Sequence, residues 1–235
     1  MISHKYKCIF IELPKNASTS ITEWLYKNDE STLGSQCDHP YKGMRWQQNK
    51  QYRDGHLHTA ELRHEYRKYW DDYYKFAVIR NPFERVFSCY SMYVSEAWKR
   101  SNGKGELTKH DKRLHEEALS YEGFSDFCKG YLDRITLHVI FQNGDRFSKE
   151  KLYHTTHIRE QSDWINPTKE WSDDINIIRH ENLGKELGDI ADTLGIPFDE
   201  KDFLTPKAGY FINVKGKSMG DYRDFYDEES IKIVE

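Results

Sequence analysis

A lysine and three hydroxyl residues lie close together near the start of the chain, where an apolar run at residues 8–13 gives way to a helical pattern at residues 18–25. They are Lys15, Ser18, Thr19 and Ser20. A strand that feeds a loop into a helix places unpaired N–H groups and the positive end of the helix dipole at that loop. Lysine and hydroxyl side chains add further donors for an oxyanion. The stretch therefore predicts a phosphate-binding loop.

The order of these residues differs from the common nucleotide-binding pattern G-x-x-x-x-G-K-[ST]. No glycine lies between Pro14 and Trp24, and the lysine precedes the hydroxyl cluster. A purely structural alternative is a capped helix after an edge strand, with Ser18 as the N-cap and Lys15 in solvent. This stretch alone leaves both interpretations open.

A second stretch repeats the layout of apolar strand, charged turn and helix. Residues 74–79 form the apolar run, and Arg80 stands where this predicted strand ends. Pro82 suits the first turn of a helix, where its missing N–H costs nothing, and Ser88 lies two turns further on. A guanidinium at a strand end can bind a phosphate in bidentate geometry.

Together the two stretches resemble the sulfotransferases that use 3′-phosphoadenosine 5′-phosphosulfate (PAPS). Pro-Lys-x-x-Ser-Thr-Ser at residues 14–20 resembles the family's 5′-phosphosulfate loop. Residues 80–90 contain every fixed position of its 3′-phosphate motif, Arg-Asn-Pro-x-x-Arg-x-x-Ser-x-Tyr. The likeness is greatest to the branch that contains the carbohydrate sulfotransferases.

The resemblance implies which residues bind PAPS and its product PAP. Lys15 and the backbone amides and hydroxyls that follow it would hold the 5′-phosphosulfate; these following residues are Asn16, Ala17, Ser18, Thr19 and Ser20. Arg80 and Ser88 would hold the 3′-phosphate. A later stretch, residues 214–225, resembles a third family loop in which Lys215 and Gly216 would close over that phosphate, or it is simply a flexible loop. In it Val214 and Tyr222 stand where the family has Arg and Trp.

Sulfuryl transfer to a hydroxyl needs a general base, and the pKa of histidine lies near working pH. Residues 55–63 resemble the family's Gly-His stretch, and alignment on Glu61-Leu62-Arg63 places the family histidine at His56. His58 is the second candidate for the base. A solvated surface histidine or a helix-cap partner is the structural alternative.

Residues 154–161 contain two further candidate sites. The family often carries an Arg-x-Gln near the donor or acceptor, which corresponds to Arg159 and Gln161. His154 and His157 could chelate a metal from one helix, but no further ligand stands nearby in the sequence. We expect no metal requirement.

The implied reaction is an in-line attack on sulfur by a hydroxyl or amine of a glycan or small-molecule acceptor. Lys15 would stabilise the charge on the leaving phosphate oxygen. One alternative is a P-loop kinase or other nucleotide phosphotransferase, which needs a Mg²⁺-binding carboxylate after a strand, whereas Asp71 and Asp72 precede one. The other is a non-catalytic PAP-binding protein.

Strands alternating with helices must position these residues. Residues 174–179 form another strand, and the helix that follows to about residue 194 ends at Gly195. The pattern predicts an α/β fold, P-loop-like and three-layered, with a central parallel sheet flanked by helices and ligands at the carboxyl ends of the strands. With 235 residues, we expect one domain over residues 1–235.

Other segments are assigned by composition and period. Residues 28–54 and 99–113 are predicted loops; the first could cover an acceptor, and the second has a net charge of +4 from its six basic and two acidic residues. That basic loop either attracts an acidic acceptor or is a solvated face. Residues 122–132 have the spacing of an amphipathic helix.

The whole-chain composition excludes several classes. Hydrophobic residues make up 37% and charged residues 31%, as in a globular protein, and the net charge of −4 argues against a general nucleic-acid binder. The four cysteines form no zinc pattern, and Cys8 and Cys89 fit buried free thiols in a reducing compartment. No apolar run is long enough to span a bilayer and no signal-peptide core is visible. We therefore expect a cytoplasmic protein without a membrane partner; its oligomeric state is left open.

Overall fold

The computed structural model describes residues 1–29, 59–94, 109–132, 160–165, 174–201 and 221–235. These residues fall into two compact units. The first draws on Met1–Arg80 and Arg159–Leu204, and the second on Asn81–Ile158 and Thr205–Glu235. The single domain over residues 1–235 stays a prediction.

The first unit contains a mixed sheet with strand order β1-β2-β3-β4. Its strands are β1 (Ile2–Ser3), β2 (Cys8–Ile11), β3 (Tyr74–Ile79) and β4 (Ile175–Arg179). The pairs β2–β3 and β3–β4 are parallel, as predicted, but β1 pairs with β2 in the antiparallel direction. This corrects the expectation of an all-parallel sheet. Only four residues join β1 to β2, which is too short for a parallel crossover.

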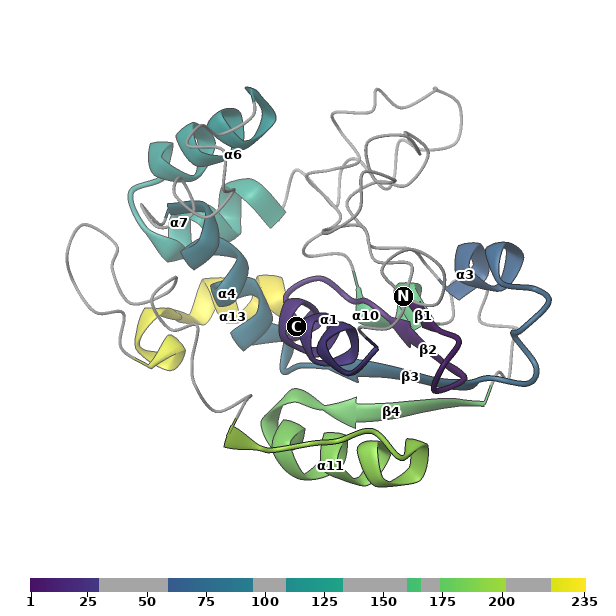
Figure 1. Cartoon of the computed structure of the whole chain (residues 1–235). Coiled ribbons are helices and arrows are strands. Elements are labelled where there is room, and N and C mark those ends of the chain that lie inside the picture. The colour runs from purple at the N-terminus through teal and green to yellow at the C-terminus, as the bar shows by residue number, and fades with distance from the viewer. Residues whose placement is uncertain (30–58, 95–108, 133–159, 166–173, 202–220) are drawn as a thin grey trace. The chain divides into compact units, whose positions relative to one another are not determined.

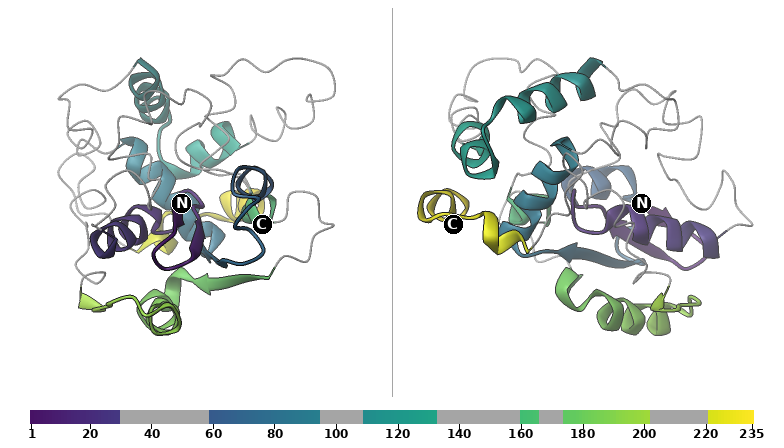
Figure 2. Two further views of the ribbon diagram at one scale, coloured as in Figure 1. Left: turned by 45° about the vertical axis from the view of Figure 1, so that its right-hand side comes forward. Right: turned by 90° about the vertical axis from the view of Figure 1, so that its left-hand side faces the viewer.

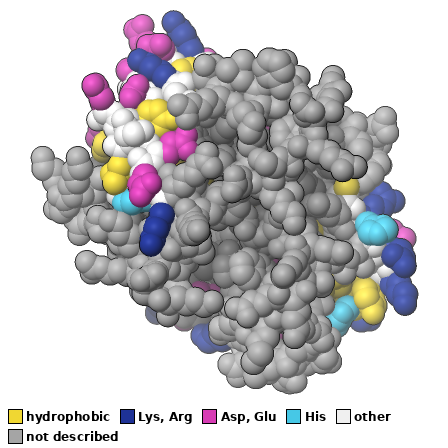
Figure 3. Space-filling model, turned by 90° about the horizontal axis from the view of Figure 1, so that it is seen from above, with side chains coloured by type: hydrophobic (Ala, Val, Ile, Leu, Met, Phe, Trp, Pro, Cys, Tyr) yellow, Lys and Arg dark blue, Asp and Glu magenta, His cyan; other side chains and the backbone are white. Residues whose placement is uncertain are grey.

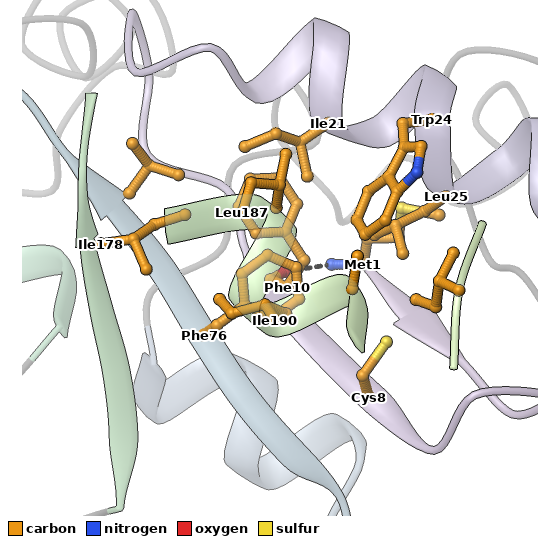
Figure 4. Close-up of a cluster of buried hydrophobic side chains, with 13 residues drawn as sticks. Met1, Cys8, Phe10, Ile21, Trp24, Leu25, Phe76, Ile178, Leu187 and Ile190 are labelled. Carbon is orange, nitrogen blue, oxygen red and sulfur yellow. Dashed lines mark hydrogen bonds between the residues drawn. The ribbon is translucent and has the colours of Figure 1, made fainter. Parts of the chain in front are cut away.

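One face of this sheet packs against two helices, α1 (Ser18–Asn28) and α11 (Leu183–Leu194). Figure 4 shows Ile21 and Trp24 of α1 and Leu187 of α11 gathered around Phe10 and Phe76 of the sheet. The rings of Phe10 and Phe76 stack with centroids 5.0 Å apart because these residues are directly paired in the β2–β3 register. Burying each such ring contributes about 1.5–3 kcal/mol.

The opposite face carries the alternate side chains of the strands. Ile9 and Ile11 of β2 and Ala77 of β3 pack with Leu62 and Trp164. Leu62 belongs to α3 (Thr59–Glu65), and Trp164 to α10 (Gln161–Ile165). Helices therefore cover both faces of the sheet. Successive side chains of a strand point to opposite faces, so a continuous apolar run needs a cover on each face. This part of the prediction, an α/β unit with helix layers on both sides, is confirmed.

The helix α11 follows β4 through a short 3₁₀ turn, η4 (His180–Asn182), and lies along β4 (Figures 1 and 2). It ends where predicted, at Gly195, whose φ of 67° places it in the left-handed region. The N–H of Ile196 then donates to the Ala191 carbonyl at 2.9 Å, which satisfies one of the last helical carbonyls. Glycine is suited to this position because it lacks a Cβ.

The second unit is helical in its described residues. It contains α4 (Pro82–Val94), α6 (Lys109–Ser120), α7 (Phe124–Phe127), the π-turn η2 (Cys128–Leu132), the 3₁₀ turn η6 (Tyr222–Phe225) and α13 (Glu228–Val234). Aromatic side chains dominate its core: the Phe87 ring packs edge-on to Phe124, and the Tyr90 ring lies 5.0 Å from Phe127. The helix predicted at residues 122–132 is confirmed from Phe124 to Leu132, with a π-helical second half, whereas Glu122 and Gly123 precede it.

Part of the predicted loop at residues 99–113 is instead helical, because α6 begins at Lys109. The apolar period that would have indicated this helix is weak. Three of its twelve residues are apolar, Leu114, Ala118 and Leu119, and among its described side chains His115 and Ala118 are buried. Charged side chains of both signs mix on the described surface that Figure 3 shows. Residues 95–108 and 30–58, which hold the remaining parts of the two predicted loops, lie outside the described residues.

Candidate anion-binding site

The predicted phosphate loop follows the carboxyl end of β2. Its backbone enters the left-handed region twice, at Lys15 with φ 67° and at Ala17 with φ 59°. Such conformations cost energy for residues with a side chain and gather at ligand-binding sites. Turns of this kind direct successive N–H groups to one side, which is how backbone nests bind anions. Residues 15–17, which include no glycine, are therefore a candidate for such an anion cradle.

The helix α1 begins directly after this cradle. Ser18 is its first residue, and the Ala17 carbonyl accepts a bond from the Ile21 N–H at 3.1 Å. Ala17 therefore occupies the N-cap position that the structural alternative gave to Ser18. Alanine has no side-chain oxygen to cap the first N–H groups of the helix, so it does not compete with an external anion for them.

Asn16 joins this loop to the sheet. Its side chain is buried, with 1% of the residue exposed. Asn16 Nδ2 donates to the Val78 carbonyl at 2.7 Å and to Gln161 Oε1 at 2.6 Å. The sequence predicted only a backbone role for Asn16; the structure adds a side-chain role in holding the loop.

Arg80 lies at the end of β3 and is fixed at both its backbone and its side chain. Its N–H donates to Gln161 Oε1 at 2.9 Å, and its carbonyl accepts from Gln161 Nε2 at 2.8 Å. Its Nη1 donates to the Lys15 carbonyl at 3.1 Å. The structure thus brings together three predicted residues, Lys15, Arg80 and Gln161, at the carboxyl ends of β2 and β3.

A buried carboxyl group stands just before the loop. Glu12 follows β2 and is 2% exposed. Burial raises its pKa above the ordinary 4.5, and the Met1 ammonium, 3.5 Å from Glu12 Oε1, opposes this rise. No local pattern indicated a buried carboxyl here, because a glutamate at a strand end is usually exposed.

The turn after Arg80 opens the second unit. Asn81 Oδ1 accepts from the N–H groups of Phe83 and Glu84 at 3.0 and 3.3 Å, so Asn81 caps α4. Pro82 then stands in the first turn, as predicted. Ser88 lies on α4 and is buried, with 6% of the residue exposed. Asn81 and Pro82 of the motif are therefore explained by helix initiation.

Several predicted site residues lie outside the described residues: His56, His58, Arg159, Lys215 and Gly216. Their roles stay predictions. Thr59, the residue after His58, is described and donates from Oγ1 to the Trp164 carbonyl at 2.8 Å. It is the first residue of α3.

The described residues contain no cluster of three or more histidine, cysteine, aspartate or glutamate side chains that could hold a metal ion. Within the same residues, every helix is too short or too polar to cross a bilayer.

The fold is mixed α/β, and the candidate site lies at the carboxyl ends of the parallel strands β2 and β3. A model of the sulfotransferase family matches residues 1–211 of the 235. The chain belongs to the sulfotransferase family, as the two motifs predicted, and the carbohydrate-sulfotransferase branch is consistent with that family. Comparison with curated proteins and with solved structures gave no match.

Proposed function

We propose that the protein transfers the sulfuryl group of PAPS to a hydroxyl or amine of a glycan or small-molecule acceptor and releases PAP. Membership of the sulfotransferase family supports sulfuryl transfer with a donor of the PAPS type. The observation that carries the donor assignment is the bond from Arg80 Nη1 to the Lys15 carbonyl. It keeps a guanidinium beside a left-handed loop that begins with a lysine, a setting suited to a ligand with more than one anionic group.

In this proposal the P-loop-like cradle holds the 5′-phosphosulfate. Lys15 supplies charge, the backbone N–H groups of residues 16–20 supply directed donors, and Ser18, Thr19 and Ser20 add hydroxyls. Arg80 is the candidate for the 3′-phosphate that distinguishes PAP from ADP. Ser88, Lys215 and Gly216 are assigned to the same phosphate by the family resemblance alone.

The chemical step is a displacement at sulfur. His56, or His58 in its place, takes the proton of the acceptor as the acceptor atom forms its bond to sulfur. The bond between sulfur and the bridging phosphate oxygen breaks, and Lys15 stabilises the negative charge that this oxygen gains. The anchored start of α3 at Thr59 supports this choice of base segment, because it directly follows His58.

The positions of Asp71 and Asp72 do not suit the Mg²⁺ site that a kinase needs. Asp71 and Asp72 are exposed and precede β3, so they stand at the amino end of that strand. Lys15 and Arg80 stand at the carboxyl ends of β2 and β3. A Mg²⁺-binding carboxylate would have to lie beside the phosphates, on the latter edge.

Thermal unfolding with PAP, ADP or ATP, each with and without Mg²⁺, tests the donor assignment. At equal concentrations of the three nucleotides, we expect PAP to stabilise the protein most, independently of Mg²⁺. A ligand at 100 times its Kd raises the free energy of unfolding by about 2.7 kcal/mol. A screen of glycans and small molecules with PAPS then tests transfer. Greater stabilisation by ATP with Mg²⁺ would replace the proposal with a kinase. Binding of PAP without transfer to any acceptor class would indicate a non-catalytic PAP-binding protein.

A cytoplasmic location is part of the proposal. It is supported by Cys8, Cys89 and Cys128, which are buried free thiols. Burial raises the pKa of Cys8 and of Cys128 to about 12, which keeps these thiols protonated and unreactive.

A further inference from the structure

We propose that Gln161 is a positioning residue that fixes the spacing between the phosphate loop and Arg80, and thereby the spacing of the two anion subsites. This inference rests on the proposed function. The proposed role of Gln161 is indirect, and the evidence for it is the set of hydrogen bonds made by its side-chain amide.

Both ends of the Gln161 amide are engaged. Its oxygen accepts from the backbone N–H of Arg80 at 2.9 Å and from Asn16 Nδ2 at 2.6 Å. Its nitrogen donates to the Arg80 carbonyl at 2.8 Å. The side chain therefore pairs with the Arg80 backbone as a neighbouring strand would. The pairing of β3 ends at Ala77 with β2 and at Ile79 with β4, so the Gln161 amide bonds backbone groups just beyond these ladders.

The same amide reaches the loop through Asn16. Asn16 is bonded in turn to the Val78 carbonyl of β3, and the Lys15 carbonyl accepts from Arg80 Nη1. Gln161 is thus the one group in these contacts that bonds both to the loop and to the backbone of Arg80. Its removal would leave the bonds from Asn16 to Val78 and from Arg80 Nη1 to Lys15, but would remove the bonds that fix the Arg80 backbone.

The helix that carries Gln161 is held by packing and by a hydrogen bond. Gln161 begins α10, and Trp164 of the same helix is buried with 2% of the residue exposed. The Trp164 carbonyl accepts from Thr59 Oγ1, which ties α10 to α3. Because the backbone of α10 is held by this packing, the amide of Gln161 can hold its partners in place rather than follow them.

Glutamine is the residue type that this arrangement needs. A glutamate of the same shape would keep the two accepting contacts, but its second oxygen would face the Arg80 carbonyl, and its charge would repel phosphate. A methionine keeps the approximate volume and removes all three bonds. The two substitutions therefore separate loss of bonding from added repulsion.

The test measures Kd for PAP, 5′-AMP and 3′-AMP in wild type, Gln161→Met, Gln161→Glu and Ser162→Ala. Ser162 is the exposed neighbour on α10 and serves as the matched control. For Gln161→Met we expect the PAP Kd to rise by about ten-fold or more, since misplacement of about 1 Å can cost that much. The two single-phosphate ligands should lose less, because neither spans both subsites. Gln161→Glu should weaken PAP further, and Ser162→Ala should match wild type.

A purely structural role for Gln161 would lower the melting temperature of the free protein and leave the ratio of the PAP and 5′-AMP affinities unchanged. That result, or an unchanged PAP Kd, would overturn the inference. If Gln161→Met does not fold, Gln161→Asn provides the same comparison, because it keeps an uncharged amide but shortens the side chain by one methylene. Failure of wild type to bind PAP would instead overturn the proposed function, so the two failures are distinguishable.

Discussion

At the scale of the residue, Lys15 combines a positive charge with an unusual backbone conformation. Its φ is 67°, and its carbonyl accepts a bond from Arg80 Nη1. The left-handed conformation turns the chain back on itself just after β2, so the lysine begins the loop that leads into α1. Its proposed task is to stabilise the phosphate oxygen that leaves sulfur.

Lys15→Ala should therefore lower kcat with PAPS by a factor on the order of 10²–10³, since an interaction made mainly in the transition state is lost. Lys15→Arg should retain part of the activity, because the charge remains. The matched control is Lys7→Ala: Lys7 is also left-handed, with φ 48°, but it is exposed and precedes β2. A Lys15→Ala enzyme within a few-fold of wild type would remove Lys15 from the mechanism.

At the scale of the element, the junction of β2 and α1 depends on Ala17. Its φ of 59° is unfavourable for alanine, and its place as N-cap leaves the first turn of α1 without a side-chain cap. Both features cost stability and both favour an external anion. We infer that the junction is shaped for binding at some expense of stability.

Ala17→Gly tests this trade. Glycine avoids the cost of a left-handed conformation, which raises the free energy of unfolding by about 1–2 kcal/mol. Glycine also makes the unfolded chain more flexible, which lowers that free energy by about 0.4–1 kcal/mol. We expect a net gain of roughly 0.5–1 kcal/mol in the free energy of unfolding, measured with urea, and little change in the PAP Kd. Ala17→Val is the companion variant. Its branched side chain is poorly tolerated at positive φ, so it should lose both stability and PAP affinity. Equal stability of the Gly and Val variants would contradict the left-handed assignment.

At the scale of the whole molecule, the buried carboxyl of Glu12 should shape how stability depends on pH. Its pKa is raised in the folded state, mainly by burial, so the folded state holds this proton more tightly than the unfolded chain does. The contribution of Glu12 to the free energy of unfolding therefore falls as pH rises above the unfolded value of about 4.5. It is constant again once pH exceeds the folded pKa.

Glu12→Gln removes this titration and keeps the shape of the side chain. We expect the variant to lose less stability than wild type between pH 4.5 and pH 8, as followed by urea unfolding and the fluorescence of the buried Trp24 and Trp70. Glu23→Gln, an exposed carboxyl on α1, is the control and should keep the wild-type profile. Parallel profiles for Glu12→Gln and wild type would show that Glu12 titrates alike in the folded and unfolded states.

Much of the fold followed from local patterns along the chain. The apolar runs predicted β2, β3 and β4, Pro82 marked the first turn of α4, and Gly195 marked the end of α11. These signals depend on a few neighbouring residues, so they can be read without knowing the rest of the structure. The polar helix α6 was missed for the same reason, because only three of its twelve residues are apolar and leave little apolar period.

By itself, the sequence determined the family, the strand–helix units and the placing of Lys15 and Arg80 at strand ends. Only the tertiary structure decided how those residues are held. Asn16 and Gln161 are 145 positions apart, and Arg80 and Gln161 are 81 apart, yet one amide bonds to both. Parallel pairing of β2 with β3 brings their carboxyl ends to one edge, and the packing of α10 against the sheet presents Gln161 there. No local pattern encodes such a contact, because it exists only after distant segments have packed together.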